Sequence, residues 1–195
     1  MTQISSIQKG YLILKYFIKK NINLLLTYIQ LIDFYMFLYI KNTSKRVFVI
    51  DIDNTICDTG NFRKQHRMKE IPETFIFRNV PIYINAWKFL EYLQGKNETI
   101  ILLSAREPKY LKISKAYFKS NKIYPDKIYC IERVKYKRNF FINKPKITYY
   151  FYDDMSFGHE KNKLGFYKEE ISYYQSITSK NFNFSTNPLD TKAIL

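Results

Sequence analysis

The sequence contains few of the residues that build most transition-metal sites and disulfide frameworks. Among 195 residues there are two cysteines, Cys57 and Cys130, and two histidines, His66 and His159. The cysteines have neither metal-site spacing nor a pairing pattern, so we expect reduced, semi-buried thiols in a cytoplasmic protein. Two histidines are too few for a histidine-based metal site. A metal ion in this protein would therefore be held by oxygen ligands, which favours Mg²⁺.

The sequence also lacks a short apolar segment followed by a small-residue cleavage site, so a removable signal peptide is not expected. It contains no internal repeat and no recognisable nucleic-acid-binding module. Positive charge, by contrast, is in excess: 32 Lys and Arg residues face 17 Asp and Glu residues, for a formal net charge of +15. This charge fits an anionic partner, whether a phosphorylated substrate, nucleic acid or an acidic membrane surface. An AT-rich coding sequence would enrich Lys in the same way without selection for binding.

Residues 7–41 are predicted to form one long, mostly apolar helix. Its polar residues recur every three or four positions and so form one narrow stripe, made of Lys15, Lys19, Asn23, Thr27, Gln30 and Asp33. On a membrane-insertion scale the apolar residues of 22–40 contribute about −5 kcal/mol, and Asp33 with its polar neighbours offsets most of this. Two interpretations follow. Either the helix lies on or in a membrane with its lysines near anionic head groups, or its wide apolar face packs on the domain or on another subunit.

Beyond a polar hinge at 41–46, apolar strands alternate with helices. Strands are predicted at 47–52, 99–103, 127–131 and 147–152, and helices at 82–94, 108–120, 136–143 and 163–174. Continuous apolar strands alternating with helices are typical of a parallel sheet that is covered on both faces. We therefore expect an α/β protein with a Rossmann-like parallel sheet, preceded by a long apolar N-terminal helix.

The same pattern divides the chain into three parts. The N-terminal helix and its hinge occupy residues 1–45, and the α/β domain occupies residues 46–180. Within the domain, residues 56–80 are predicted to be an irregular, basic insert. Residues 181–195 are polar and are expected to form a loose tail.

Three of the predicted strands end in acidic or hydroxyl side chains. The first ends in "DIDNT" (51–55), the second in "LLSAR" (102–106) and the last in "FYDDMS" (151–156). Ligands of a parallel sheet bind beyond the carboxyl ends of its strands, where these residues would meet. We expect Asp51, Asp53 and Asp153 to converge on a divalent cation, whose charge relieves the repulsion between the carboxylates.

The segments "VFVIDIDNT", "IILLSAR" and "ITYYFYDDMS", in this order and at these intervals, resemble the sequence motifs of the haloacid dehalogenase (HAD) superfamily of phosphotransferases. The resemblance covers residues 46–178 and leaves out the N-terminal helix. It implies that Asp51 is a nucleophile that forms an aspartyl-phosphate, and that Asp53 is a general acid and base. It also implies Mg²⁺ bound by Asp51, the main-chain carbonyl of Asp53, and Asp153, with Asp154 close by or acting through water.

The resemblance further implies that Thr55 and Ser104 donate hydrogen bonds to phosphate oxygens, and that a lysine holds the phosphate beside the nucleophile. Four lysines precede the last motif: Lys135, Lys137, Lys144 and Lys146. We favour Lys137, because Phe140 and Phe141 would form the buried face of its helix and leave the lysine to point toward the site. Lys144 is the second choice and Lys135 the third.

The arginine of "LLSAR", Arg106, is expected either to contact the substrate or to pair with an acidic neighbour. The insert at 56–80 occupies the position where family members carry a substrate-selecting cap, and it is too short for a full cap domain. An open site would admit large substrates such as a nucleic-acid end, a phosphoprotein or a lipid-linked phosphate. His159, just beyond the last motif, is expected to be a loop residue.

The leading expectation is a cytoplasmic, Mg²⁺-dependent phosphatase that hydrolyses a phosphate monoester. A polynucleotide-end or nucleotide phosphatase is an alternative of the same chemistry. A non-catalytic, membrane-associated binding protein on the same fold is an alternative of a different class.

Overall fold

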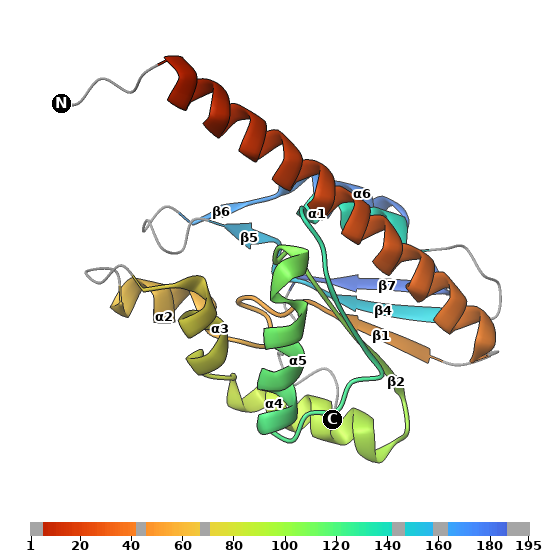
Figure 1. The fold of residues 1–195 in the computed structure, drawn as a ribbon. Coiled ribbons are helices and arrows are strands. Elements are labelled where there is room, and N and C mark those ends of the chain that lie inside the picture. Colours follow the sequence, from red (N-terminus) through yellow and green to blue (C-terminus); the bar gives the residue numbers. More distant parts are fainter. Residues whose placement is uncertain (1–5, 42–45, 67–70, 142–146, 158–163, 187–195) are drawn as a thin grey trace.

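The structure, a computed structural model, describes residues 6–41, 46–66, 71–141, 147–157 and 164–186. Helices surround a parallel sheet, and a long N-terminal helix, α1 (Ser6–Ile40), runs along one side of the molecule (Figure 1). These features confirm the predicted α/β class, the parallel sheet and the long apolar helix.

The sheet has five parallel strands in the order β3-β2-β1-β4-β7. Their bounds are β1 (Arg46–Ile50), β2 (Thr99–Ser104), β3 (Lys127–Cys130), β4 (Thr148–Tyr152) and β7 (Phe182–Ser185). Ile50, the last residue of β1, is level with Leu102 of β2 and with Tyr152 of β4. The residues that follow these three strands therefore emerge along one edge of the sheet, as expected for the acidic motifs.

Helices cover both faces of the sheet. Successive side chains of β1 point to opposite faces and therefore pack into two separate cores. Phe48 and Ile50 belong to the core formed with α4 (Ile84–Gly95) and α5 (Leu111–Ser120). Val47 and Val49 belong to the opposite core, which also contains residues of α1, of the 3₁₀ helix η2 (Val134–Phe140) and of α6 (Lys168–Ser176). A further 3₁₀ turn, η1 (Pro108–Tyr110), precedes α5.

Two segments are more regular than predicted. The basic insert contains two short helices, α2 (Thr59–Gln65) and α3 (Glu73–Asn79), and the Asp58 side chain caps the first of them. The expected loose tail begins instead with strand β7, because Phe182 packs against Tyr174 of α6. Residues 187–195 of that tail lie outside the described residues. A small antiparallel pair, β5 (Ser156–Phe157) and β6 (Gly165–Phe166), follows β4.

Helix α1 covers the outer edge of the sheet at β3. The side-chain amide of Gln30 donates to the carbonyl of Cys130 at 2.7 Å, and its oxygen accepts from the N–H of Cys130 at 2.8 Å. Phe34 and Leu38, about one and two turns after Gln30 along α1, are buried in the core. A glutamine from the helix thus satisfies backbone groups that an edge strand would otherwise leave unpaired.

We expect Gln30→Leu to lower the free energy of unfolding by about 2–4 kcal/mol, because it leaves a buried N–H and a buried C=O of Cys130 without a partner. Urea unfolding at pH 7 measures this loss. Ile29→Leu, at the neighbouring exposed position, is the matched control and should leave stability within about 0.5 kcal/mol. Equal stability of the two variants would contradict the role given to Gln30.

Candidate active site

Three carboxylates meet at the carboxyl edge of the sheet. Asp51 follows β1, and its N–H donates to the carbonyl of Tyr152 at 2.8 Å, which continues the pairing of β1 with β4. Asp153 and Asp154 follow β4. Ligand oxygens of Asp51, Asp153 and Asp154 all lie within 4.8 Å of one another. Asp51 and Asp153 are 5 % and 3 % exposed, so two of these charges are almost fully removed from water.

A buried lysine lies between two of the carboxylates. Lys137 of η2 is 1 % exposed, and its ammonium donates to Oδ1 of Asp51 and to Oδ2 of Asp153, each at 2.5 Å. Lys135 is exposed, and its ammonium lies over the ring of Tyr136. Lys144 and Lys146 lie outside the described residues.

Lys137 reaches the carboxylates by a different geometry from the one expected. The sequence interpretation assumed a helix in which the lysine points away from the buried phenylalanines. In the structure the segment is a 3₁₀ helix, in which residues three apart lie on the same side. Lys137 and Phe140 are therefore both on the inward face and both buried.

Asp51, Asp153 and Asp154 place three acidic groups around the one ammonium of Lys137. Burial raises the pKa of Asp51 well above its ordinary value; the Lys137 charge opposes this rise and the Asp153 charge adds to it. Burial and the neighbouring Asp153 raise the pKa of Asp154 to about 7. Burial alone would lower the pKa of Lys137, but the carboxylates of Asp153 and Asp51 outweigh it and raise that pKa. One ammonium does not compensate three carboxylates.

The chemistry of this group fits a hard divalent cation. Its ligand atoms are all carboxylate oxygens, the ligands that Mg²⁺ and Ca²⁺ prefer. A bound dication would supply the positive charge that the carboxylates lack. The two thiols play no part in this site: Cys57 and Cys130 are fully buried, and burial raises their pKa values to about 12 and about 11.

The turn after β1 brings Thr55 to the same group. The N–H groups of Ile56 and Cys57 both donate to the carbonyl of Ile52, at 3.0 and 2.8 Å, and close the turn. Asn54 has a φ of 61°, a conformation that asparagine tolerates better than most residues. Thr55 is 1 % exposed, and its hydroxyl accepts from the N–H of Asp154 at 3.1 Å.

Asp53 belongs to a second, neighbouring cluster. Arg106 donates to both of its carboxylate oxygens, from Nε at 2.9 Å and from Nη2 at 2.8 Å. Ser104 donates to it at 3.0 Å and Thr59 at 2.7 Å. Burial would raise the pKa of Asp53, but the charge and hydrogen bonds of Arg106 outweigh it and hold that pKa at about 2.

Of the three carboxylates that were expected to converge, the structure brings Asp51 and Asp153 together, with Asp154 beside them, whereas the Asp53 carboxylate is bound by Arg106. The Arg106 side chain is 1 % exposed and its guanidinium lies 4.1 Å from the ring centre of Phe77, so of its two expected roles the structure shows pairing with an acidic neighbour. Ser104 is fully buried, and its hydroxyl donates to Asp53. No spacing rule in the sequence pointed to Thr59 or Phe77.

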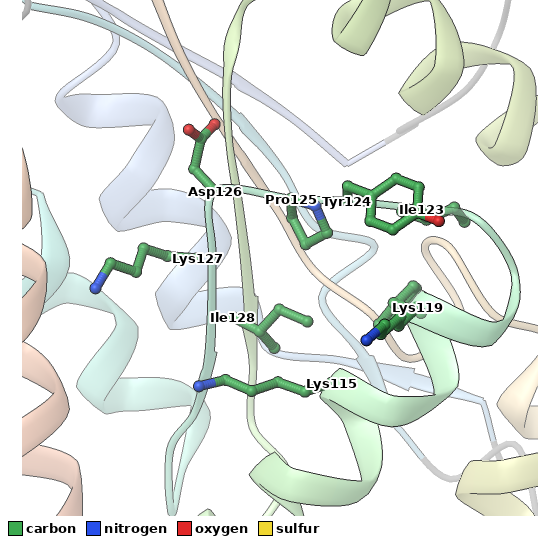
Figure 2. Close-up of a pocket in the computed structure, with 9 residues that line it drawn as sticks. Lys115, Lys119, Ile123, Tyr124, Pro125, Asp126, Lys127 and Ile128 are labelled. Atoms are coloured by element: carbon green, nitrogen blue, oxygen red, sulfur yellow. The ribbon is translucent and has the colours of Figure 1, made fainter.

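A hollow in the surface lies elsewhere, between α5 and the amino end of β3 (Figure 2). Lys115 and Lys119 line it from the helix and Tyr124 from the connecting loop. Because β3 begins here at Lys127, the hollow is at the opposite end of that strand from the edge where the carboxylates meet.

We expect Arg106→Gln to lower the free energy of unfolding at pH 7 by about 3–5 kcal/mol, because it leaves the Asp53 charge without its partner. The pKa of Asp53 is about 2 when folded and about 3.9 in an unfolded chain, so the pair contributes fully above about pH 5 and its contribution is lost as the pH falls through the folded pKa. Urea unfolding of wild type and variant between pH 7 and pH 3 measures both effects.

Arg46→Gln is the matched control, because Arg46 also pairs with a carboxylate, that of Glu98, but is 56 % exposed. It should cost less than about 1 kcal/mol. A loss for Arg106→Gln no larger than for this control would show that the Asp53 pair contributes little to the fold.

Neither a protein-family model nor a curated protein sequence matches this chain. What the site does must therefore be argued from its own chemistry. That chemistry consists of two adjoining clusters at one edge of a parallel sheet: one with unbalanced carboxylates around Asp51, and one with a balanced ion pair at Asp53.

Proposed function

We propose that this protein is a Mg²⁺-dependent phosphatase of the HAD type, which hydrolyses a phosphate monoester through an aspartyl-phosphate on Asp51. One observation carries the proposal. The Asp51 carboxylate, at the end of the central strand β1, is held by Lys137 and lies beside Asp153 and Asp154. One group thus offers a carboxylate for the role of nucleophile, an ammonium for phosphate binding and carboxylate oxygens for a dication.

The chemical steps follow from these positions. An oxygen of Asp51 attacks phosphorus, the bond to the ester oxygen breaks, and the alcohol leaves with a proton. Water then attacks the same phosphorus, inorganic phosphate leaves and the Asp51 carboxylate is restored. Mg²⁺ held by Asp51, Asp153 and Asp154 would neutralise the repulsion between the carboxylate and the phosphate. Lys137 holds Asp51 in place and adds a further positive charge.

Asp53 is the residue for proton transfer in this proposal, and its present contacts set a condition on that role. With a pKa of about 2 and Arg106 on both of its oxygens, Asp53 carries no proton at neutral pH. To protonate the leaving oxygen, the Asp53 side chain must rotate away from Arg106, where burial would raise its pKa again. Thr55, whose hydroxyl accepts from the N–H of Asp154, is the hydroxyl that we assign to phosphate binding, since the Ser104 hydroxyl donates to Asp53.

The substrate is proposed only as a class. The insert beside the site consists of the short helices α2 and α3, whose basic residues Lys64 and Arg78 are exposed. Two helices of this length would cover only a small part of the site. A phosphate group attached to a large molecule could therefore still reach it. Nucleotides and phosphorylated oligonucleotide ends therefore belong among the substrates to be tested, together with phosphopeptides, sugar phosphates and lipid phosphates.

We expect Mg²⁺-dependent phosphate release from at least one of these substrate classes, which EDTA abolishes and Asp51→Asn reduces by at least about 10³-fold. Glu91→Gln, an exposed surface change, should keep wild-type activity. The thermal unfolding temperature with and without Mg²⁺ is measured on the same samples. Release that survives Asp51→Asn would contradict the mechanism. A Mg²⁺-dependent rise in unfolding temperature without turnover on any substrate would favour a binding role instead.

The lysines of η2 provide a matched pair of variants. Lys137→Met removes a buried ammonium bound to two carboxylates, whereas Lys135→Met removes an exposed one two residues away. We expect kcat/KM to fall by at least about 100-fold for Lys137→Met and by less than twofold for Lys135→Met. Steady-state kinetics on the best substrate, with folding checked by circular dichroism, measures both. Similar losses in the two variants would exclude Lys137 as the specific phosphate ligand.

A further inference from the structure

Helix α1 turns its polar stripe toward the protein. Asn23, Thr27 and Gln30 are buried, at 7 %, 4 % and 8 % exposure. The Thr27 hydroxyl accepts from the N–H of Glu132 at 3.2 Å, in addition to the two hydrogen bonds of Gln30 with Cys130. The stripe that a soluble helix would expose to water is therefore the face that docks on the domain.

The ends of the stripe are fixed by charged contacts. Toward the N-terminus, Lys19 forms an ion pair with Glu107 at 3.0 Å. Toward the C-terminus, Asp33 accepts from Lys127 at 2.9 Å and from the hydroxyl of Tyr129 at 2.8 Å. These contacts span about four turns of the helix, so its orientation on the domain is well defined.

The opposite face of α1 is apolar and exposed. Most of the large apolar side chains that are exposed in the described part of the chain belong to α1, and on its outer face these are Leu14, Phe17, Ile18, Ile22, Leu25, Tyr28, Ile29, Ile32, Met36, Tyr39 and Ile40. Ile22, Ile29 and Ile32 are 51 %, 51 % and 62 % exposed. Between residues 21 and 40 the helix contains one charged residue, Asp33, which belongs to the polar stripe and pairs with Lys127 of the domain. A contiguous apolar surface of this length marks an interaction site.

We propose that α1 lies in the plane of an anionic membrane surface, with this outer face among the acyl chains and its polar stripe holding the catalytic domain on the aqueous side. Charge selects the lipid surface over a second copy of the chain. A chain with a net charge of +15 repels its own copy, whereas an anionic leaflet attracts it. Lys15 and Lys20, both exposed near one end of the face, would lie at the level of the head groups.

The contacts of the stripe argue against a membrane-spanning helix. The segment Leu14–Ile40 is long and apolar enough to cross a bilayer. Crossing would pull Gln30 away from Cys130 and Asp33 away from Lys127, and would place both side chains in hydrocarbon. An aspartate alone costs about 2.5–3.5 kcal/mol at the centre of an inserted helix. A helix in the plane of the interface keeps all of these contacts.

The experiment uses the full chain, transferred from mild detergent to vesicles of phosphatidylcholine alone or of phosphatidylcholine with about 30 % phosphatidylserine, which gives the surface a negative potential. Flotation measures the bound fraction. We expect binding to the anionic vesicles, weaker binding to the neutral ones, and release by alkaline carbonate. The triple variant Ile22→Glu, Ile29→Glu, Ile32→Glu should lose at least about tenfold in partitioning, because it places three charges on the face that would enter the acyl chains.

Ile84→Glu is the matched control, because Ile84 is an equally exposed isoleucine, 64 % accessible, on α4. It should bind like the wild type. Circular dichroism and thermal unfolding verify that the variants are folded, which is expected because all four side chains are exposed. Three results would overturn the proposal: binding that the triple variant keeps, resistance to carbonate extraction as for a spanning helix, or a wild type that ignores vesicles and forms a dimer that the triple variant dissociates.

Discussion

The fold of the site depends on one buried ammonium group. Lys137 donates to Asp51 and to Asp153, and so ties η2 to the ends of the two adjacent strands β1 and β4. Two carboxylates that follow neighbouring parallel strands are forced close together, and burial increases the cost of their charge. The lysine makes that arrangement tolerable without making it neutral. The unbalanced acidic groups are what attract a cation, and in our proposal that cation offsets the repulsion between Asp51 and the phosphate.

The two clusters at this edge are opposite in electrostatic character. At Asp53, an arginine fork and two hydroxyl groups satisfy the carboxylate, and its pKa lies below the ordinary value. At Asp51 and Asp154, burial and like charge leave pKa values above the ordinary value. Groups with raised pKa values in an incompletely compensated cluster are typical of functional sites, whereas a satisfied buried pair is also typical of structure. Rotation of Asp53 between these two environments would change its acidity.

Much of the sheet and part of the site could be predicted from the sequence, for a physical reason. Buried parallel strands require continuous apolar runs, so β1, β2 and β4 are visible in the sequence, and the carboxylates that follow them must share an edge. The partner of Asp53 could not be predicted, because the choice between Arg106 and a metal depends on side-chain rotamers. The 3₁₀ geometry around Lys137 is likewise absent from a pattern read with a period of 3.6 residues. The short helices of the insert and strand β7 are too brief for periodicity to reveal them.

The packing of α1 on η2 has a mechanical consequence. The ring of Phe34 on α1 lies 5.1 Å from the ring of Phe140, and Phe140 is three residues from Lys137 on the same rigid 3₁₀ turn. The hydroxyl of Tyr35 on α1 also donates to the carbonyl of Asn139. A force that tilts α1 relative to the sheet would therefore shift η2, and with it the Lys137 ammonium between Asp51 and Asp153. Whatever the outer face of α1 binds is thus linked, through two aromatic rings and one turn of backbone, to the ammonium group between Asp51 and Asp153.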